Sequence, residues 1–292
     1  MSWPRITDLF TDAKDADIAL VGAPMDARSV NPADYHRAPG VLRETLKRFS
    51  TYDVETGGEI ELSIRDHGDV PVQGMSPEDG FAPVRDAVAA ATAAHGLTLL
   101  VGGHNGVTRP AAHGLGVPIG EVGLITLDAH FDLRGTEEGL MNGNPVRALL
   151  EDGLPGANIC QIGLAPFANT AEMHRIARDA GIGVWTIAEV KRQGIAPVLD
   201  AARARLGHCA ALMVDFDIDV IDRAQCPGAP GARPGGMSAD MFFEAARLLA
   251  ADPRVRLVDL TEFDPGRDVG EVTALTAARW ACEILAGYTA RG

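Results

Sequence analysis

Short, almost continuously apolar segments alternate with helix-forming segments along this chain, and no other feature of the sequence restricts the fold more. Segments of strand length begin near residues 16, 63, 97, 123, 158, 183, 211 and 255, and all except the one at 63 are largely apolar. Strands that are apolar throughout, without alternation, are typical of a parallel sheet covered by helices on both faces. We therefore predict a mostly parallel sheet between two helical layers, in one domain that spans residues 1–292.

Capping residues and prolines set the expected helix boundaries. Ser76 offers a capping hydroxyl and Pro77 suits a first helical turn, so a helix is predicted from there to about residue 95. Asn169 is expected to cap a helix that ends near Ala180. One further helix is expected between the strand at 183–186 and about residue 206.

Two of the predicted strands run from apolar residues directly into metal-type ligands spaced two apart. The side chains concerned are Asp128, His130 and Asp132 after the run that begins at Gly123, and Asp217 and Asp219 after the run that begins at Ala211. In a strand this spacing places the side chains on one face. Carboxylates crowded at strand ends repel each other unless a cation or a hydrogen-bond network holds them. We therefore expect the two strand ends to face each other across two divalent cations.

The ligand types indicate which metal would bind. Four carboxylates with a single imidazole suit Mn²⁺ or a similar divalent ion better than structural zinc, which favours thiolates and histidines. The alternative is that the acids cap helices or face solvent, as most single aspartates do. Two such clusters, each at the end of an apolar strand, favour the metal site.

The overall composition excludes several classes of partner. A net charge of −14 and a pI near 4.9 argue against binding to nucleic acid or to an anionic membrane. The four cysteines are far apart without paired spacing, which is typical of reduced residues in a cytoplasmic protein. No uncharged apolar run reaches about 18 residues, and the N-terminus lacks the pattern of a signal peptide. We expect a cytoplasmic protein that acts on a small molecule.

Four segments together resemble the signatures of the ureohydrolases, the family of arginase, agmatinase and formimidoylglutamase. They are Gly102–Asn105, Asp128–Asp132, Phe216–Asp222 and Glu262–Pro265. The resemblance covers roughly residues 16–288 in order and spacing. It implies a three-layer α/β/α sandwich of the arginase type, two Mn²⁺ ions per chain, and hydrolysis of a guanidino or formimino group. It also implies subunit association, so a homo-oligomer is possible, and other divalent ions could replace manganese.

The resemblance assigns roles to the metal-type ligands by position. Asp128 and Asp217 would bridge the two ions. Asp132 would complete one ion and orient the attacking water, while His130 and Asp219 would bind the other ion. Glu262, from the fourth segment, would face the positively charged amidinium of the substrate and so share with Asp132 the catalytic role.

The first signature departs from the family pattern, which ends in a histidine ligand after Gly-Gly-Asp. Asn105 occupies the slot of that histidine and His104 occupies the slot of the aspartate. Asn105 could ligate the first ion through its amide oxygen, a weaker and uncharged donor, as in family members that hydrolyse hydroxyarginine. His104 could ligate instead or could hydrogen-bond to a ligand. The sequence leaves both choices open.

Two further departures bear on the substrate. Asn142 stands where arginases and agmatinases have a histidine that shuttles protons, and the segment 162–170 lacks the acids that hold the amino group of arginine. Strict arginase activity is therefore not expected. The segments 128–134, 162–170 and 227–236 look more like the formimidoylglutamase branch.

Substrate contacts are expected from Arg134, Asn142 and Asn144 in addition to Glu262. Arg134 follows a ligand by two residues and could pair with a substrate carboxylate, although a surface arginine is the alternative. Without a histidine at 142, the proton for the leaving nitrogen would come from Asp132, or from a histidine in a nearby loop. His36 and His67 are the histidines considered for this role, and a loop or capping role is their alternative.

The sequence therefore predicts a binuclear manganese hydrolase of linear amidines, similar to formimidoylglutamase and acting on an amino-acid-like substrate. Within the same class, an amidinohydrolase of hydroxyarginine or of a guanidino acid is the alternative. A metal-poor pseudoenzyme with a binding or regulatory role is the alternative from another class, because two working histidines are replaced by asparagine.

Overall fold

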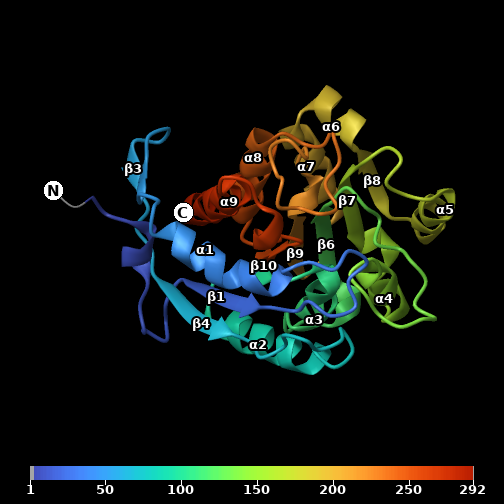
Figure 1. Cartoon of the computed structure of the whole chain (residues 1–292), viewed down its shortest axis with the longest axis horizontal. Coiled ribbons are helices and arrows are strands. Elements are labelled where there is room, and N and C mark those ends of the chain that lie inside the picture. Colours follow the sequence, from blue (N-terminus) through green and yellow to red (C-terminus); the bar gives the residue numbers. More distant parts are fainter. Residues whose placement is uncertain (1–2, 292) are drawn as a thin grey trace.

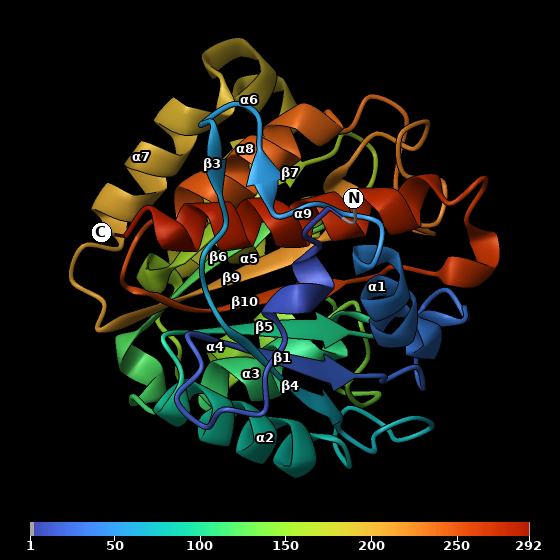
Figure 2. The same cartoon turned by 90° about the vertical axis from the view of Figure 1, so that its left-hand side faces the viewer.

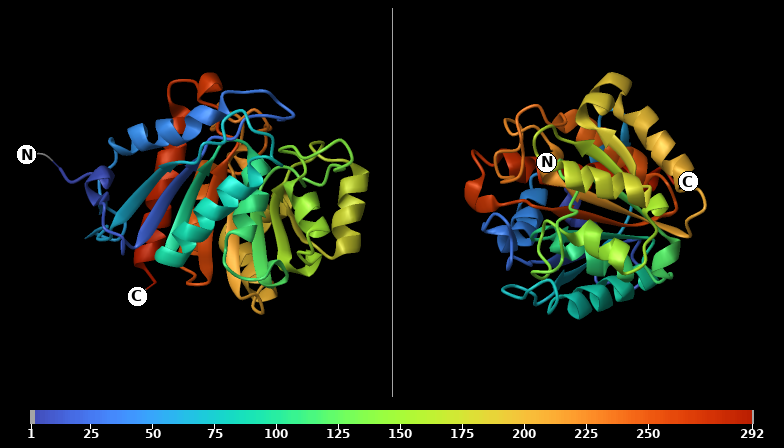
Figure 3. Two further views of the ribbon diagram at one scale, coloured as in Figure 1. Left: turned by 90° about the horizontal axis from the view of Figure 1, so that it is seen from below. Right: turned by 90° about the vertical axis from the view of Figure 1, so that its right-hand side faces the viewer.

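The computed structural model describes residues 3–291, and its centre is one sheet of eight strands. The strands follow the order β4-β1-β5-β10-β9-β6-β7-β8, and each neighbouring pair is parallel. Their bounds are β1 Ile18–Ala23, β4 Ile64–Asp69, β5 Leu97–Gly102, β6 Val122–Leu127, β7 Ile159–Leu164, β8 Gly183–Thr186, β9 Ala211–Asp217 and β10 Val255–Thr261. The last two strands of the sequence lie between the N-terminal strands and the middle strands, as the colour order in Figure 3 shows.

Nine α-helices within the described residues cover the two faces of this sheet (Figure 1). Their bounds are α1 Ala38–Leu46, α2 Phe81–Ala94, α3 Thr108–His113, α4 Pro145–Glu151, α5 Ala171–Ala180, α6 Ile187–Gln193, α7 Ile195–Arg205, α8 Ala239–Ala250 and α9 Val272–Thr289. Helices α1 and α6 to α9 lie on one face, and α2 to α4 lie on the other (Figure 2). Two apolar cores result, one on each face, which confirms the predicted parallel sheet between helical layers.

The larger core is closed by aromatic rings and by small residues that let helices approach. Phe216 on β9 packs edge-on against Phe242 of α8 and Trp280 of α9, with ring centroids 5.4 and 5.6 Å away. Gly287 of α9 has no room for a side chain, since a Cβ there would lie 2.2 Å from the carbonyl oxygen of Arg247. Removing a fully buried aromatic side chain such as that of Trp280 costs about 3–5 kcal/mol of stability.

Two predicted helix boundaries were wrong, and one pair of short strands was missed. The helix expected from Ser76 begins only at Phe81, because the Ser76 hydroxyl accepts from the backbone N–H of Asp79 at 3.2 Å and closes a separate turn. The helix expected as far as residue 206 is divided into α6 and α7 at Gly194, whose φ of 85° is outside the helical region. A two-stranded antiparallel pair, β2 Tyr52–Asp53 and β3 Gly58–Glu59, was not predicted.

No helix in residues 3–291 has the length and apolar character needed to span a bilayer. The four cysteines are free thiols, and three of them are buried, as expected for core residues. Most of the acidic residues that the sequence singled out lie at the carboxyl ends of β6 and β9, two neighbouring strands near the middle of the sheet.

Candidate metal centre and active site

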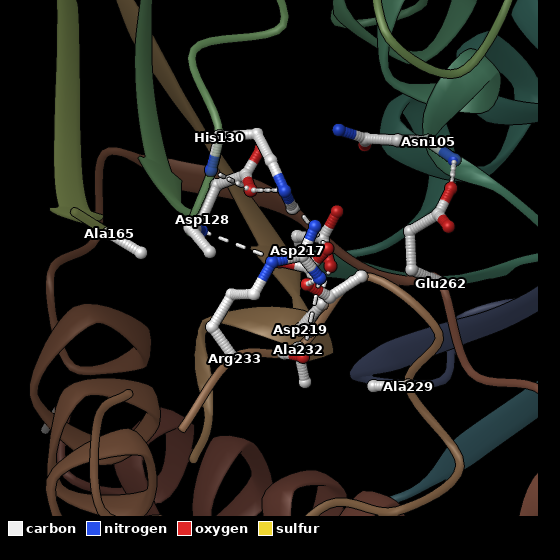
Figure 4. A network of polar contacts seen from close by, with 12 residues as sticks. Asn105, Asp128, His130, Ala165, Asp217, Asp219, Ala229, Ala232, Arg233 and Glu262 are labelled. Atoms are coloured by element: carbon white, nitrogen blue, oxygen red, sulfur yellow. Dashed lines mark hydrogen bonds and ion pairs between the residues drawn. The ribbon is translucent and has the colours of Figure 1, made fainter. Parts of the chain in front are cut away.

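Four adjacent strands at the centre of the sheet, β5, β10, β9 and β6, place the expected metal-type ligands and Glu262 at one edge. Asn105 follows β5 and Glu262 follows β10. Asp217 is the last residue of β9, Asp219 lies just beyond it, and Asp128 to Asp132 follow β6. Carboxyl ends of parallel strands lie on the same edge of the sheet, which is where α/β sheets bind ligands. Figure 4 shows the side chains from these separate strands directed into one region.

Strand β6 ends at Leu127, so Asp128, His130 and Asp132 are presented by a loop. The prediction that two-residue spacing along a strand aligns these three side chains was therefore wrong. The backbone N–H of His130 donates to Oδ1 of Asp128 at 2.7 Å, and Asp132 has a left-handed backbone with φ of 52°. Such a conformation costs a non-glycine residue about 1–3 kcal/mol and is concentrated at functional sites.

Asn169 holds this loop from outside. Its Oδ1 accepts from the backbone N–H of Phe131 at 2.8 Å, and its Nδ2 donates to the carbonyl oxygen of Ala129 at 2.9 Å. The helix cap predicted for Asn169 is provided by Thr170, whose hydroxyl accepts from Met173 N–H. Asn169 thus fixes the peptide units on either side of His130, a role that the sequence did not indicate.

Asp128, His130 and Asp219 form the closest group of potential ligands in the described part of the chain. One ligand atom from each lies within 4.8 Å of the others. Nδ1 of His130 lies 3.1 Å from Oδ2 of Asp219 and 3.4 Å from Oδ1 of Asp128. The charge of Asp219, followed by contacts with Asp128, raises the pKa of His130 to about 12 despite burial.

The remaining acids lie beside this group and have little compensating positive charge. Asp217 Oδ1 accepts from the backbone N–H of Asp219 at 2.8 Å. Burial and the charge of Asp219 raise the pKa of Asp217, and burial and the charge of Asp128 raise the pKa of Asp132. Burial followed by the charge of Asp219 also raises the pKa of Asp128, to about 6. A divalent cation supplies the positive charge that these buried carboxylates lack, so the donor set fits such an ion.

The amide of Asn105 is oriented by three hydrogen bonds. Its Oδ1 accepts from the hydroxyls of Thr108 at 2.7 Å and Thr261 at 3.2 Å, and its Nδ2 donates to Oδ2 of Asp132 at 2.6 Å. The reversed amide would place two oxygens against each other at Asp132, which is repulsive. Asn105 therefore offers an N–H to the acidic cluster, and its amide oxygen is engaged elsewhere.

His104 lies beside Asn105 in sequence but is engaged away from the ligands. Its Nδ1 accepts from the backbone N–H of Gly106 at 3.0 Å, so its Nε2 carries the proton donated to the carbonyl oxygen of Ala27 at 2.7 Å. Burial lowers the pKa of His104 to about 4. A neutral histidine with both nitrogens engaged has no free lone pair for a metal, and neither hydrogen-bond partner of His104 is a metal-type ligand, so His104 adopts neither of the two roles that the sequence left open.

Glu262 faces the same region from the end of β10, with a left-handed backbone of φ 61°. Its Oε1 accepts from Nδ2 of Asn142 and from the backbone N–H of Asn105, both at 2.9 Å. Oδ1 of Asn142 in turn accepts from the backbone N–H of Val30 at 2.8 Å. Burial raises the pKa of Glu262 to about 7, although these hydrogen bonds oppose the shift.

A pocket of about 180 Å³ opens over these residues. Its charged lining comprises His130, Asp132, Arg134, Asp217, Asp219, Arg233 and Glu262. The volume is smaller than the roughly 300–1,000 Å³ of sites for drug-sized ligands, so a compact substrate fits. Asn142, from which a substrate contact was expected, also lines the pocket.

Other predicted site residues lie away from the pocket. Asn144 is buried, its Nδ2 donates to the carbonyl oxygens of Gly135 and Gly139, and it is not part of the described pocket lining, so its contacts shape the loop. His36 pairs with Asp26 at 3.0 Å, and His67 hydrogen-bonds to His95 at 3.1 Å. Neither histidine is in the pocket lining, which leaves Asp132 as the proton donor proposed from the sequence.

Two residues that sequence reasoning missed come from the glycine- and proline-rich loop after β9. Gly231 packs directly on the ligands, since a Cβ there would lie 1.9 Å from Oδ2 of Asp219. Arg233 lines the pocket two residues later. The only signal in the sequence was the density of Pro and Gly in 227–236, which predicts a shaped loop but does not identify the residues that face the ligands.

Comparison with known proteins agrees with this geometry. The chain is 32% identical over 283 residues to the formimidoylglutamase of Halalkalibacterium halodurans, which covers 94% of this chain and 89% of that protein. The crystal structure of the Bacillus subtilis formimidoylglutamase superposes with a TM-score of 0.92 at 26% identity, covering 98% and 92% of the two chains. Trypanosoma cruzi formiminoglutamase, crystallised with two Mn²⁺, shares the fold with a TM-score of 0.90 at 23% identity, covering 98% and 99%.

The model of the arginase family matches residues 16–287. This match runs from before β1 into the final helix, so it includes the sheet and every strand end that contributes to the acidic pocket. With nearly the whole chain matched and the ligand-bearing loops in the expected places, the protein belongs to the arginase family.

Proposed function

We propose that the protein is a binuclear manganese hydrolase that cleaves the C–N bond of a formimino group on a glutamate-like amino acid. The observation that carries the proposal is the arrangement of one pocket. Five metal-type ligands line or adjoin its buried end, and Glu262 faces them from a separate strand. Formimidoylglutamases are the relatives with 32% identity over nearly the full chain and with the TM-score of 0.92.

Two manganese ions per chain fit the donor set. Asp128 and Asp217 would bridge the ions, and His130 and Asp219 would hold one of them. Asp132 would hold the other, while Asn105 donates to it. Trypanosoma cruzi formiminoglutamase binds two Mn²⁺ in the same fold, which supports this number. Other hard divalent ions are compatible with oxygen-rich ligands.

When bound, the ions would act as Lewis acids and make water nucleophilic near neutral pH. The side chains of the chain position the other reactants. Glu262, held by Asn142 and Asn105, presents a carboxylate to the planar, cationic amidine and orients its carbon toward the ligands. Asp132 is within reach of the same space and can receive the proton of the attacking water and return it to the leaving nitrogen.

The pocket favours an acidic substrate over arginine. The segment Ala165–Asn169 beside the pocket contains no carboxylate that would hold a free amino group, and Arg134 lines the opening. A guanidino acid or hydroxyarginine would also place a cationic head at Glu262. The formimino substrate is preferred because the most similar relatives described above are formimidoylglutamases.

The test is a substrate panel with Mn²⁺-loaded protein. N-formimidoyl-L-glutamate, arginine, hydroxyarginine, agmatine and guanidinobutyrate are compared, and formamide, urea or hydroxyurea is measured. We expect formamide from the first compound at the highest kcat/KM. Urea as the main product would replace the proposal with a guanidino-acid hydrolase. No product from any compound, with less than one metal per chain, would favour the metal-poor pseudoenzyme.

We further propose that residues 1–292 form one domain, and that the protein works in the cytoplasm as a homo-oligomer. The eight-stranded sheet contains both the first strand of the chain, β1, and the last, β10, which supports a single domain. Four free cysteines are consistent with a reducing compartment. Sedimentation equilibrium of the purified protein measures the assembly, and a monomer at micromolar concentration would contradict the oligomer.

A further inference from the structure

Charges in the pocket are divided between its buried end and its opening. The carboxylates of Asp132, Asp217, Asp219 and Glu262 are at most 7% exposed. Arg134 and Arg233 are exposed, and they are the two cationic residues other than His130 in the described pocket lining. A ligand that matches this pocket therefore has a cationic head and an anionic tail.

The two arginines reach the opening from different loops. Arg134 belongs to the loop between β6 and α4, and its side chain lies over Gly143, where a Cβ would be 2.7 Å from Cδ of Arg134. Arg233 belongs to the loop between β9 and α8, and Figure 4 shows its side chain extending toward Asp217 and Asp219. Two separate guanidinium groups can therefore approach one ligand from two directions.

The loop of Arg233 is held firmly against the ligands. The guanidinium group of Arg223 donates to the carbonyl oxygens of Ala229 and Pro230. The backbone N–H of Arg223 donates to the carbonyl oxygen of Arg233 at 3.2 Å. Gly231 contacts the ligands directly, as described above. The base of Arg233 is thus pre-positioned, which lowers the entropic cost of binding an anion.

Neither guanidinium group has a carboxylate partner within residues 3–291. Nη1 of Arg233 donates to the carbonyl oxygen of Gly231 at 2.5 Å and approaches that of Ala232 at 3.4 Å. Its Nε and Nη2 remain available, and a carboxylate binds two such N–H groups side by side. The backbone N–H of Arg134 donates to the carbonyl oxygen of Gly143, and within residues 3–291 its guanidinium group is available as well.

We propose that Arg134 and Arg233 each bind one carboxylate of the substrate, so that the pocket selects dicarboxylic amino-acid amidines over monocarboxylic ones. This inference rests on the proposed function and adds to it the two residues that set the specificity. A guanidino acid has one carboxylate and would engage one arginine. An N-formimidoyl derivative of glutamate has two carboxylates beyond its cationic head, and it would engage both.

A structural role is the competing explanation for Arg233, because its Nη1 donates to two carbonyl oxygens of its own loop. The two explanations predict different kinetics. Loss of a substrate contact that is equal in ground and transition states raises KM and leaves kcat unchanged. Loss of loop structure would displace Gly231 and the ligands beneath it, which lowers kcat and metal content together.

The experiment combines arginine removal with carboxylate removal. Arg233→Gln, Arg134→Gln and Arg233→Lys are assayed with N-formimidoyl-L-glutamate, with N-formimidoyl-4-aminobutyrate, which lacks the α-carboxylate, and with N-formimidoyl-L-glutamine, which lacks the γ-carboxylate. Arg192→Gln is the matched control, since Arg192 is exposed on α6 away from the pocket and its removal changes the net charge equally. Manganese content is measured for each variant.

We expect Arg233→Gln to raise KM for the dicarboxylate about 10- to 100-fold, as for a lost hydrogen bond to a charged group, with kcat and metal content retained. The effect should persist on one single-carboxylate analogue and vanish on the other, and Arg134→Gln should show the opposite pattern. Arg233→Lys should restore part of the affinity. Equal effects on all three substrates, or no effect, would overturn the inference.

Binding without turnover keeps this test separate from that of the proposed function. Calorimetry with Mn²⁺-loaded protein compares L-glutamate with 4-aminobutyrate in the wild type, in Arg233→Gln and in Arg134→Gln. Tighter binding of L-glutamate that disappears in one of the two variants and persists in the other supports the arginine pair even if formamide is not produced. Equal binding of the two compounds by the wild type contradicts the arginine pair even if formimidoylglutamate is hydrolysed.

Discussion

Gly231 lies against the candidate ligands so closely that a single methyl group there would displace one of them. An ideal Cβ on Gly231 would lie 1.9 Å from Oδ2 of Asp219 and 3.1 Å from Cε1 of His130. Non-bonded carbon atoms pack best at about 3.5–4.0 Å, so the carboxylate of Asp219 would have to withdraw by more than about 1 Å. Gly231→Ala therefore probes the metal ligands without removing any of them.

The size of this displacement sets the expected effect. Metal–ligand distances are held to within about 0.2 Å, so a shift of about 1 Å takes Asp219 out of the coordination shell. We expect Gly231→Ala to weaken Mn²⁺ binding by at least about 10- to 100-fold, the range seen when ligand orientation is lost. Overpacking should also lower the free energy of unfolding of the metal-free protein by about 1–3 kcal/mol.

The assay is a calorimetric titration of metal-free protein with Mn²⁺, together with urea unfolding in the presence of a chelator. Gly120→Ala is the matched control, because a Cβ at Gly120 meets no atom within 4 Å. The control should bind manganese as the wild type does. If Gly231→Ala also binds two ions with wild-type affinity, Asp219 is not a ligand and the assignment of this site is refuted.

Three further changes test separate parts of the structure. Glu262→Gln should raise KM for the amidine about 10- to 100-fold in steady-state assays, because an amide cannot pair with its charge, and an unchanged KM would contradict this role. Asn169→Ala should weaken Mn²⁺ binding about 10-fold in equilibrium dialysis, because it frees the loop around His130, and equal binding would contradict it. Burial raises the pKa of Asp152, but hydrogen bonds from Arg109 and His113 outweigh burial and hold it below its usual value. Asp152→Asn should therefore lower the free energy of unfolding by about 1 kcal/mol near neutral pH. This difference in unfolding free energy should be lost as pH falls below about 4 through the folded pKa. If urea unfolding shows the same difference near neutral pH and below about pH 4, the ion pair is contradicted.

The fold and the position of the site could be predicted because they depend on short-range patterns. Apolar runs that alternate with helix-forming segments determine the parallel sheet and its helical layers. Acids that directly follow such runs must then lie at the carboxyl edge of the sheet. Asp128 and Asp217 were located in this way without knowledge of the strand order, since every carboxyl end of a parallel sheet lies on the same side.

The local geometry of the site could not be predicted because partners far apart in sequence determine it. The orientation of the Asn105 amide depends on Thr261, which is 156 residues away. Strand β6 stops before its ligands, and Asn169 then holds the loop that presents them. Arg233 lies in a loop without periodicity, so no pattern indicated that its side chain lines the pocket.

The most direct test of the central claim is a crystal structure of Mn²⁺-loaded protein with anomalous diffraction recorded at the manganese absorption edge. The expected map has two anomalous peaks, each contacted by carboxylate oxygens of both Asp128 and Asp217. His130 and Asp219 should complete the coordination of one peak, and Asp132 should complete that of the other. A map without peaks between these two aspartates, from crystals of protein that hydrolyses its substrate, would contradict the metal-centre assignment.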